Sequence, residues 1–156
     1  MLSTEERRQL QVACNSERVG DRVWKLLSIV DDLCTVTLTA AAEAGNAIAV
    51  TINVTDLNGN AVARAQRLHC HLRDAAMLDA VAASFTMAET GAGAAVSTTA
   101  KPSLLIDTDA NGDAVVTVTD VSGSFAGTVY LEVQPLPATG SPSKSGLPAM
   151  IALTFA

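Results

Sequence analysis

Two histidines, His69 and His71, are the side chains in this sequence most suited to chemistry. They lie two positions apart in a run whose apolar residues alternate, so they share one face of a predicted strand. That spacing occurs in metal sites, but Cys70 points to the opposite face and no third ligand is apparent, whereas a catalytic metal usually has three protein ligands. We interpret the pair as part of a polar, solvent-facing strand face, and we expect no metal and no other cofactor.

The segment from Asp107 to Asp113, with the sequence DTDANGD, resembles the first half of a calcium loop. Carboxylates and an amide at alternate positions can converge on a hard cation, and a glycine allows the sharp bend. The second half is missing, because the twelfth position is Val118 rather than a bidentate glutamate. Asp-Ala-Asn-Gly between two apolar runs is also typical of a hairpin turn. The turn is the favoured interpretation, and a calcium site is the alternative.

The sequence shows no constellation for nucleophilic catalysis. Its only two histidines are neighbours, and it has no G-x-S-x-G motif. The GSFAG stretch from Gly123 to Gly127 joins two predicted strands and precedes no helix that could bind a phosphate. Because function has to be argued from a site, we expect a protein that is not an enzyme. A hydrolase or lyase on a β scaffold is a third alternative, and it would depend on a carboxylate pair that the sequence does not reveal.

The composition narrows the classes of partner. The net charge is −6 and the basic residues are dispersed apart from Arg7 and Arg8, which argues against nucleic-acid binding. No run approaches the roughly 18 apolar residues of a membrane span, and the polar, acidic N-terminus does not resemble a signal peptide. Charged residues make up 17% of the chain, below the ~25% typical of soluble domains, so we expect part of the surface to be covered in an assembly.

Three cysteines, Cys14, Cys34 and Cys70, follow the spacing of no zinc or redox motif. An odd number cannot form a complete set of disulfides within one chain. Free cysteines are commonly buried, so we expect these three to be buried thiols.

Residues 1–32 are predicted to form an N-terminal helical arm. Ser3 and Glu6 fit a capping box, Asn15 interrupts the apolar stripe, and apolar residues then recur at helical spacing. We predict that this arm contacts another protein through four residues, Val19, Val23, Trp24 and Leu27. The alternative is that these side chains cover an open end of the chain's own core, as an apolar helix stripe usually does.

From residue 33 to residue 156 the apolar period is two, which predicts strands rather than helices. About seven strands with frequent turn signals favour an antiparallel, immunoglobulin-like β-sandwich. Residues 75–87 could form a helix, or a loop followed by a strand, and residues 135–148 are predicted to be a loop. The predicted strands cover residues 34–39, 47–55, 61–73, 104–107, 114–119, 128–133 and 150–155.

Several stretches carry a family resemblance that covers most of the chain. They are EERRQLQVACNSERVGDRVWKLL (5–27), VTINVTDLNGNAVARA (50–65), LLIDTDANGDAVVTVTD (104–120), GTVYLEVQPLP (127–137) and IALTFA (151–156). Together they resemble small structural proteins of tailed bacteriophages, namely immunoglobulin-like decoration, cement or head-fibre proteins. The family has no catalytic residues to carry over.

The resemblance implies a virion protein, made in the host cytoplasm, that docks on the assembled head and stabilises it. Its partners would be the major capsid protein or other virion proteins, and copies of the chain could associate as a homo-oligomer. Multivalent contact would supply the affinity, because each contact raises the effective concentration of the next. The alternative function is a tail or fibre module whose loops bind a host-surface receptor or glycan.

Overall fold

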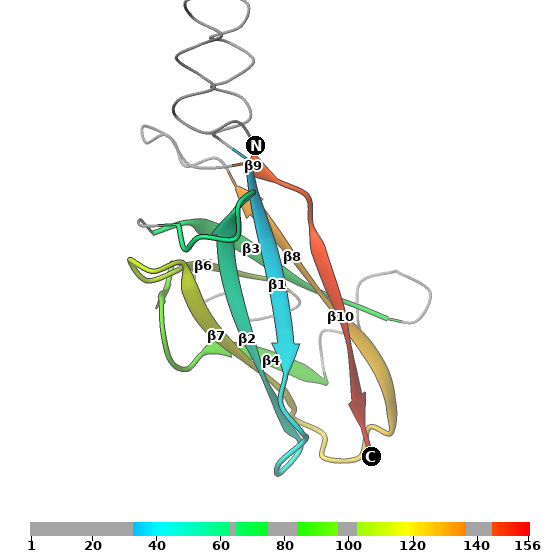
Figure 1. Cartoon of the computed structure of the whole chain (residues 1–156). Helices are drawn as coiled ribbons and strands as arrows, with labels where there is room; N and C mark the ends of the chain where they lie inside the picture. The colour runs from blue at the N-terminus through cyan, green and yellow to red at the C-terminus, as the bar shows by residue number, and fades with distance from the viewer. Residues whose placement is uncertain (1–32, 63–64, 75–83, 97–102, 137–144) are drawn as a thin grey trace, which may run out of the picture.

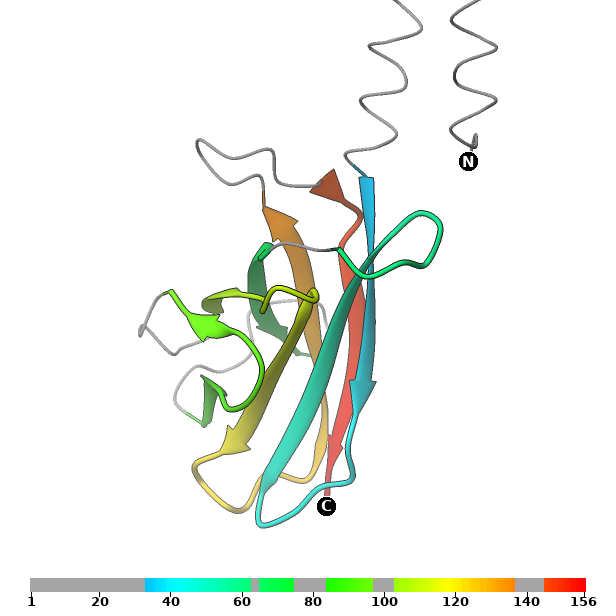
Figure 2. The ribbon, with the colours of Figure 1, turned by 60° about the vertical axis from the view of Figure 1, so that its left-hand side comes forward.

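A computed structural model describes residues 33–62, 65–74, 84–96, 103–136 and 145–156. The described residues form strands and turns, with no helix among them. The strands make two five-stranded sheets that pack face to face (Figures 1 and 2). The prediction of a mainly β, sandwich-like fold is therefore confirmed for these residues.

The first sheet has the strand order β4-β7-β2-β1-β9. Its strands are β4 (Phe85–Glu89), β7 (Asp113–Asp120), β2 (Ala47–Asp56), β1 (Leu33–Ala40) and β9 (Ser145–Gly146). The second sheet has the order β10-β8-β3-β6-β5. Its strands are β10 (Ala149–Phe155), β8 (Gly127–Leu136), β3 (Arg67–Arg73), β6 (Ser103–Asp107) and β5 (Ala94–Ala95). All neighbours are antiparallel except β1 and β9, which are parallel.

Seven strands follow the chain order and neighbours of an immunoglobulin-like sandwich. In such a fold the first, second, fifth and fourth strands form one sheet, and the third, sixth and seventh form the other. Here these positions are taken by β1, β2, β7 and β4 in one sheet and by β3, β8 and β10 in the other. Strands β5 and β6 are inserted between the fourth and fifth strands of this scheme and extend the second sheet beyond β3.

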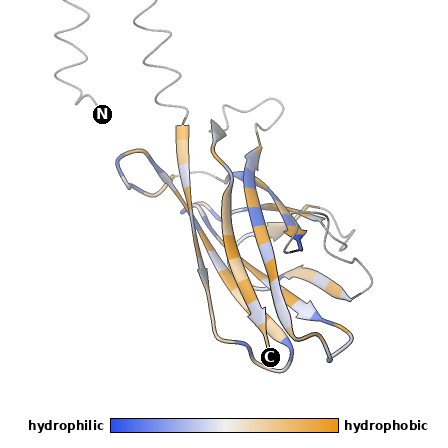
Figure 3. Ribbon diagram, turned by 90° about the vertical axis from the view of Figure 1, so that its right-hand side faces the viewer, coloured by the Kyte–Doolittle hydropathy of each residue, from blue (hydrophilic) through white to orange (hydrophobic). Residues whose placement is uncertain are grey.

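Alternate residues of each strand form the core. On β2, Val50, Ile52 and Val54 are completely buried, and Val50 lies opposite the buried Val116 of β7. Figure 3 shows the alternation as orange segments separated by paler or blue ones. Each fully buried side chain of this kind contributes about 1.5–3 kcal/mol of transfer free energy, so the valine-rich repeat is what holds the two sheets together.

Several predicted boundaries were wrong. Strand β3 begins at Arg67 rather than at residue 61, and β8 continues to Leu136, inside the predicted loop of residues 135–148. That loop region also contains β9, which pairs with the start of β1. Residues Phe85–Glu89 form β4, so the interpretation of a loop followed by a strand holds from residue 85 onward. The two-residue edge strand β9 was missed because such a short strand forms through pairing with its neighbour rather than through local sequence preference.

The predicted helical arm of residues 1–32 lies outside the described residues, and so do Val19, Val23, Trp24 and Leu27. Among the residues that the structure describes, no helix is long and apolar enough to cross a membrane.

Candidate functional site

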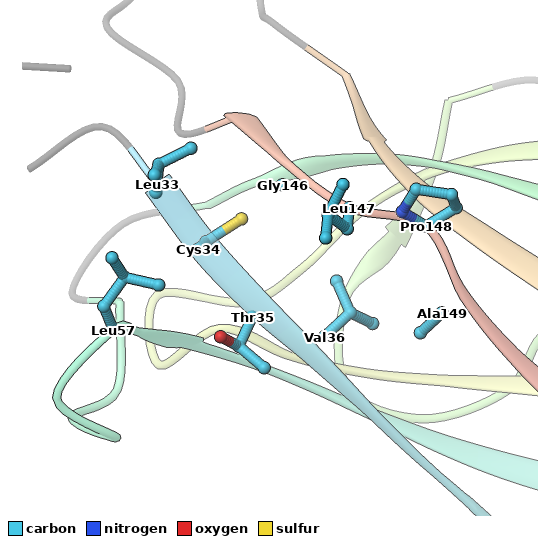
Figure 4. Close-up of a pocket in the computed structure, with 9 residues that line it drawn as sticks. All are labelled: Leu33, Cys34, Thr35, Val36, Leu57, Gly146, Leu147, Pro148 and Ala149. Atoms are coloured by element: carbon cyan, nitrogen blue, oxygen red, sulfur yellow. The ribbon is translucent and has the colours of Figure 1, made fainter. Parts of the chain in front are cut away.

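An apolar pocket lies at the end of the sandwich where β1 begins (Figure 4). We call this end the open end; it comprises the start of β1, the turn after β2, the turn before β7 and residues 146–148. The pocket has a volume of about 320 Å³ and carries no charged residue in its lining. The lining residues are Leu33, Cys34, Thr35, Val36, Leu57, Gly146, Leu147, Pro148 and Ala149.

Two large apolar side chains of this lining are exposed. Leu147 is 86% exposed and Leu57 is 46% exposed. A single exposed leucine is ordinary, whereas exposed apolar side chains that line one pocket form a small apolar surface patch. The lining comes from three separate parts of the chain, so this surface exists only in the folded protein.

Two turns of the same design frame the open end. The first is Asp56–Asn60 and the second is Asp109–Asp113, and both follow the pattern D-x-N-G-(N/D). In each, Oδ1 of the aspartate accepts hydrogen bonds from the backbone N–H groups two and four residues later, at 2.8 and 3.0 Å in the first turn and at 2.8 and 2.9 Å in the second. Each glycine has a positive φ, which is 82° for Gly59 and 86° for Gly112.

These contacts confirm the turn that was predicted for the Asp107–Asp113 segment. The carboxylate of Asp109 is engaged by its own backbone, and the hydrogen bonds from the N–H groups of Asp113 and Asn111 hold its pKa below the ordinary value. At Gly112, a Cβ would lie only 2.5 Å from the carbonyl oxygen of Val54. Glycine is therefore needed here both for backbone conformation and for the close approach of β2.

The opposite end of the sandwich is packed by aromatic rings. We call it the closed end; it comprises the turn between β1 and β2, the turn between β7 and β8, and the end of β10. Phe85, Phe125 and Phe155 meet there, with ring centroids 5.0 to 6.1 Å apart. They are all the phenylalanines in the chain. Edge-to-face aromatic packing of this kind adds stability beyond the buried area.

A buried aspartate, Asp120, organises the turn at the closed end. Its carboxylate accepts hydrogen bonds from three backbone N–H groups and a hydroxyl, which belong to Ser122, Ser124 and Phe125. Burial would raise the pKa of Asp120, but the hydrogen bonds together outweigh it and hold the pKa below the ordinary value. The sequence here is D-x-S-G-S, which keeps the Asp and Gly spacing of the other two turns with serine in place of asparagine, and that shared spacing is a signal of the turn in the sequence.

The two histidines lie where the sequence placed them, on the outer face of β3. Their ring centroids are 5.8 Å apart, and they line a polar pocket of about 240 Å³ together with Arg73, Glu132 and Gln134. Arg73 forms an ion pair with Glu132. Burial, followed by the electrostatic effect of the neighbouring His71, lowers the pKa of His69. This face therefore presents polar hydrogen-bonding side chains beside the Arg73–Glu132 ion pair.

The burial predicted for two of the three cysteines is confirmed. Cys34 and Cys70 are both buried, and burial raises the pKa of Cys70 to about 12. Cys14 lies outside the described residues. Within the described parts of the chain, no group of three or more His, Cys, Asp or Glu side chains is placed to hold a metal ion.

No family model matches this sequence, and no curated protein matches it. Similar solved structures include a β-glycosidase from Bacteroides vulgatus, at 18% identity and a TM-score of 0.48; the match covers 78% of this chain and 14% of the glycosidase. A cohesin module from a family 33 glycoside hydrolase of Clostridium perfringens matches at 10% identity and a TM-score of 0.47, over 78% of this chain and 94% of the module. MtrC from Shewanella baltica matches at 12% identity and a TM-score of 0.48, over 92% of this chain and 28% of MtrC.

This chain therefore corresponds to a small part of the glycosidase. Because these identities are 18% or less and the TM-scores are below 0.5, no activity, ligand or partner of those proteins is carried over to this chain.

Proposed function

We propose that this chain is a non-enzymatic structural protein of a tailed bacteriophage virion, which decorates the assembled head and stabilises it. The partner is the major capsid protein or another protein of the head. The proposal draws on the resemblance of the sequence to phage decoration, cement and head-fibre proteins, and on the surface of the folded domain.

The observation that carries the proposal is the exposed apolar surface at the open end. Residues 1–32, which contain the predicted contact residue Trp24, join the domain at Leu33, a lining residue of the apolar pocket. The predicted contact segment therefore directly precedes, in the sequence, the strand at which the pocket begins. Aromatic anchors and buried apolar area supply most of the affinity in attachment to a large protein surface, and both the predicted segment and the pocket could contribute to it.

The rest of the domain suits a spacer or clamp. Its two sheets bury a continuous valine and leucine core, so the shape of the domain does not depend on the partner. A decoration protein works by bridging capsid subunits, and simultaneous contacts from many rigid copies raise the avidity without any strong single contact.

A second candidate function is supported by the polar pocket on the outer face of β3 and β8. His69, His71, Gln134 and the Arg73–Glu132 pair could hydrogen-bond a polyhydroxylated ligand such as a host-surface glycan. Tyr130 lies opposite Arg73 in the register of β8 and β3, and could provide a ring for a sugar to stack on. This arrangement corresponds to a tail or fibre module rather than a head protein.

One experiment separates the two candidates. Heads are assembled from the major capsid protein encoded in the same genome, and binding of three forms of the full chain is measured by co-sedimentation: wild type, Trp24→Ala, and a His69→Ala/His71→Ala double variant. We expect wild type to reach saturating occupancy, the double variant to match it, and Trp24→Ala to bind at least about tenfold more weakly, since interface aromatic hot spots contribute 2 kcal/mol or more.

Two outcomes would contradict the head function. In the first, wild-type chain stays in the supernatant at every head concentration. In the second, only the histidine double variant loses binding, and on a glycan array wild type binds where that variant does not. Circular dichroism of each variant should retain the wild-type β spectrum, which shows that a loss of binding does not reflect unfolding.

A further inference from the structure

We infer that Asn58, in the turn that follows β2, is a site of spontaneous deamidation, and that the fold protects Asn111, in the turn before β7, from the same reaction. Both residues precede a glycine, and no other asparagine in the sequence does. The reaction needs only the folded chain and water, so it is independent of the proposed function. The two turns share their local geometry and differ in what surrounds them.

Deamidation begins when the backbone nitrogen that follows an asparagine attacks the carbonyl carbon of its side chain. At Asn58, the nitrogen of Gly59 forms a bond to Cγ, and its proton passes through water to Nδ2, which leaves as ammonia. Water then opens the resulting succinimide at either of its two carbonyl groups, which gives aspartate or isoaspartate. Glycine favours the attack, because it has no Cβ to obstruct the ring and adopts a wide range of backbone conformations.

The two turns place the same local demand on this reaction. The N–H group of Gly59 donates to the carbonyl oxygen of Asp56 at 3.0 Å. The N–H group of Gly112 donates in the same way to the carbonyl oxygen of Asp109, at 3.2 Å. Each nitrogen must leave this hydrogen bond before it can attack, so a difference in rate between the two asparagines has to come from the surroundings of each turn.

The first turn is open to solvent. Asn58, Gly59 and Asn60 are exposed, and a Cβ placed on Gly59 would meet no atom within 4 Å. Hydrogen bonds in exposed segments with few packed neighbours open at a low cost in free energy. The nitrogen of Gly59 can therefore turn toward Asn58 without displacing other parts of the fold, and the longer main chain of isoaspartate also has room.

The second turn is held against β2. Gly112 is buried, and a Cβ placed on it would lie 2.5 Å from the carbonyl oxygen of Val54. The carbonyl oxygen of Gly112 also accepts a hydrogen bond of 2.9 Å from the N–H group of Val54. Rotation of the peptide between Asn111 and Gly112 would disturb this contact with a central strand of the sheet. An added main-chain atom would have no space there.

The reaction at Asn58 changes the surface of the open end. Either product adds a negative charge beside Leu57, which lines the apolar pocket. Isoaspartate also changes the spacing between the N–H groups of residues 58 and 60, and Oδ1 of Asp56 accepts hydrogen bonds from both. The pocket, whose lining carries no charged residue, would thus gain a carboxylate beside it as the protein ages.

The test is peptide mapping of the full chain after incubation in the folded state at mildly alkaline pH. Tandem mass spectrometry locates each conversion of an amide to a carboxylate, and chromatography against synthetic peptides separates isoaspartate from aspartate. In the folded chain we expect Asn58 to convert at least about tenfold faster than Asn111. In urea, where both turns are unfolded, we expect the two residues to convert at similar rates, since each precedes a glycine.

Gly59→Ala is the matched variant, and it should slow conversion at Asn58 at least about tenfold while leaving Asn111 unchanged. The positive φ of Gly59 disfavours alanine, so the variant is also measured in urea, where the same slowing is expected whether or not it folds. Equal rates for Asn58 and Asn111 in the folded wild type would overturn the inference. It would also be overturned if Asn58 kept its amide in the folded chain and lost it in urea, or if both residues kept their amides in urea.

Discussion

The two ends of the sandwich are built from different residues. At the closed end, all three phenylalanines of the chain pack against one another, and the buried carboxylate of Asp120 fixes the turn beside them. At the open end, a pocket is lined by small and aliphatic side chains, among them Leu57 of the first D-x-N-G turn, and Leu147 is exposed to solvent. The space between the two sheets is therefore filled by aromatic rings at the closed end, whereas the open end keeps an apolar pocket.

The difference shows how a protein with few aromatic residues can keep one end of its sandwich available for contact with a partner. Aromatic side chains make up only 3% of the sequence, and each phenylalanine buries much more area than a valine. Concentrating the rings at the closed end gives that end its own core. The open end then exposes apolar surface that a partner can cover. We expect substitution of its exposed leucines to weaken binding to that partner rather than to lower the stability of the fold.

The largest expected effect is on stability at the closed end. Phe155→Ala removes a ring that is buried against Phe85 and Phe125, and should lower the free energy of unfolding by about 3–5 kcal/mol. The matched change at the open end, Leu57→Ala, should alter it by less than about 0.5 kcal/mol, because this side chain is already nearly half exposed. Urea unfolding followed by circular dichroism measures both. If the two variants lose equal stability, the contrast between the ends does not hold.

A smaller effect, which depends on pH, is expected from Asp120. Its folded-state pKa lies below the ordinary value of 3.8, so ionised Asp120 stabilises the fold above that value, and the contribution is lost as the pH falls through the folded pKa. Asp120→Asn should lower the melting temperature at pH 7 by several degrees, on the order of 2–4 °C for each kcal/mol lost.

The wild-type and Asp120→Asn melting curves should then converge as the pH falls below 3.8 and on through the lower folded-state pKa, because only there is the carboxylate protonated in both the folded and the unfolded state. Asp109 of the open end is the control, since its carboxylate accepts hydrogen bonds from its own turn in a similar way but is only partly buried. Asp109→Asn should lower the melting temperature less than Asp120→Asn does. The reverse order would contradict the assignment of Asp120 as the organiser of the closed end.

The smallest effect is expected from removing the segment that precedes the open end. Among the described residues, the buried core runs from Cys34 to Phe155, and we expect a chain of residues 33–156 to fold cooperatively. Its free energy of unfolding should fall within about 1 kcal/mol of the full chain under conditions where both are monomeric. Thermal and urea unfolding measure this, and a product that binds hydrophobic dyes and melts without cooperativity would show that residues 1–32 complete the core.

Several features were decided by the sequence alone. The two-residue period fixed which side chains of β2, β3, β7 and β8 face the core, because a one-residue slip would expose every valine of a strand. It also placed His69 and His71 together on the outer face, with Cys70 buried behind them. The Asp109 turn followed from the local sequence, since an aspartate two residues before Asn-Gly can accept hydrogen bonds from the backbone N–H groups of its own turn.

The tertiary structure decided what pairs with what. Phe85, Phe125 and Phe155 belong to distant parts of the sequence and to no common motif, yet the order of the strands brings their rings together. Leu147 was predicted to lie in a loop, and it became part of the open-end pocket only because β9 pairs with the first residues of β1. Periodicity reports which face of a strand is buried, whereas a pocket depends on which strand ends meet. That depends on long-range pairing, and local sequence does not encode it.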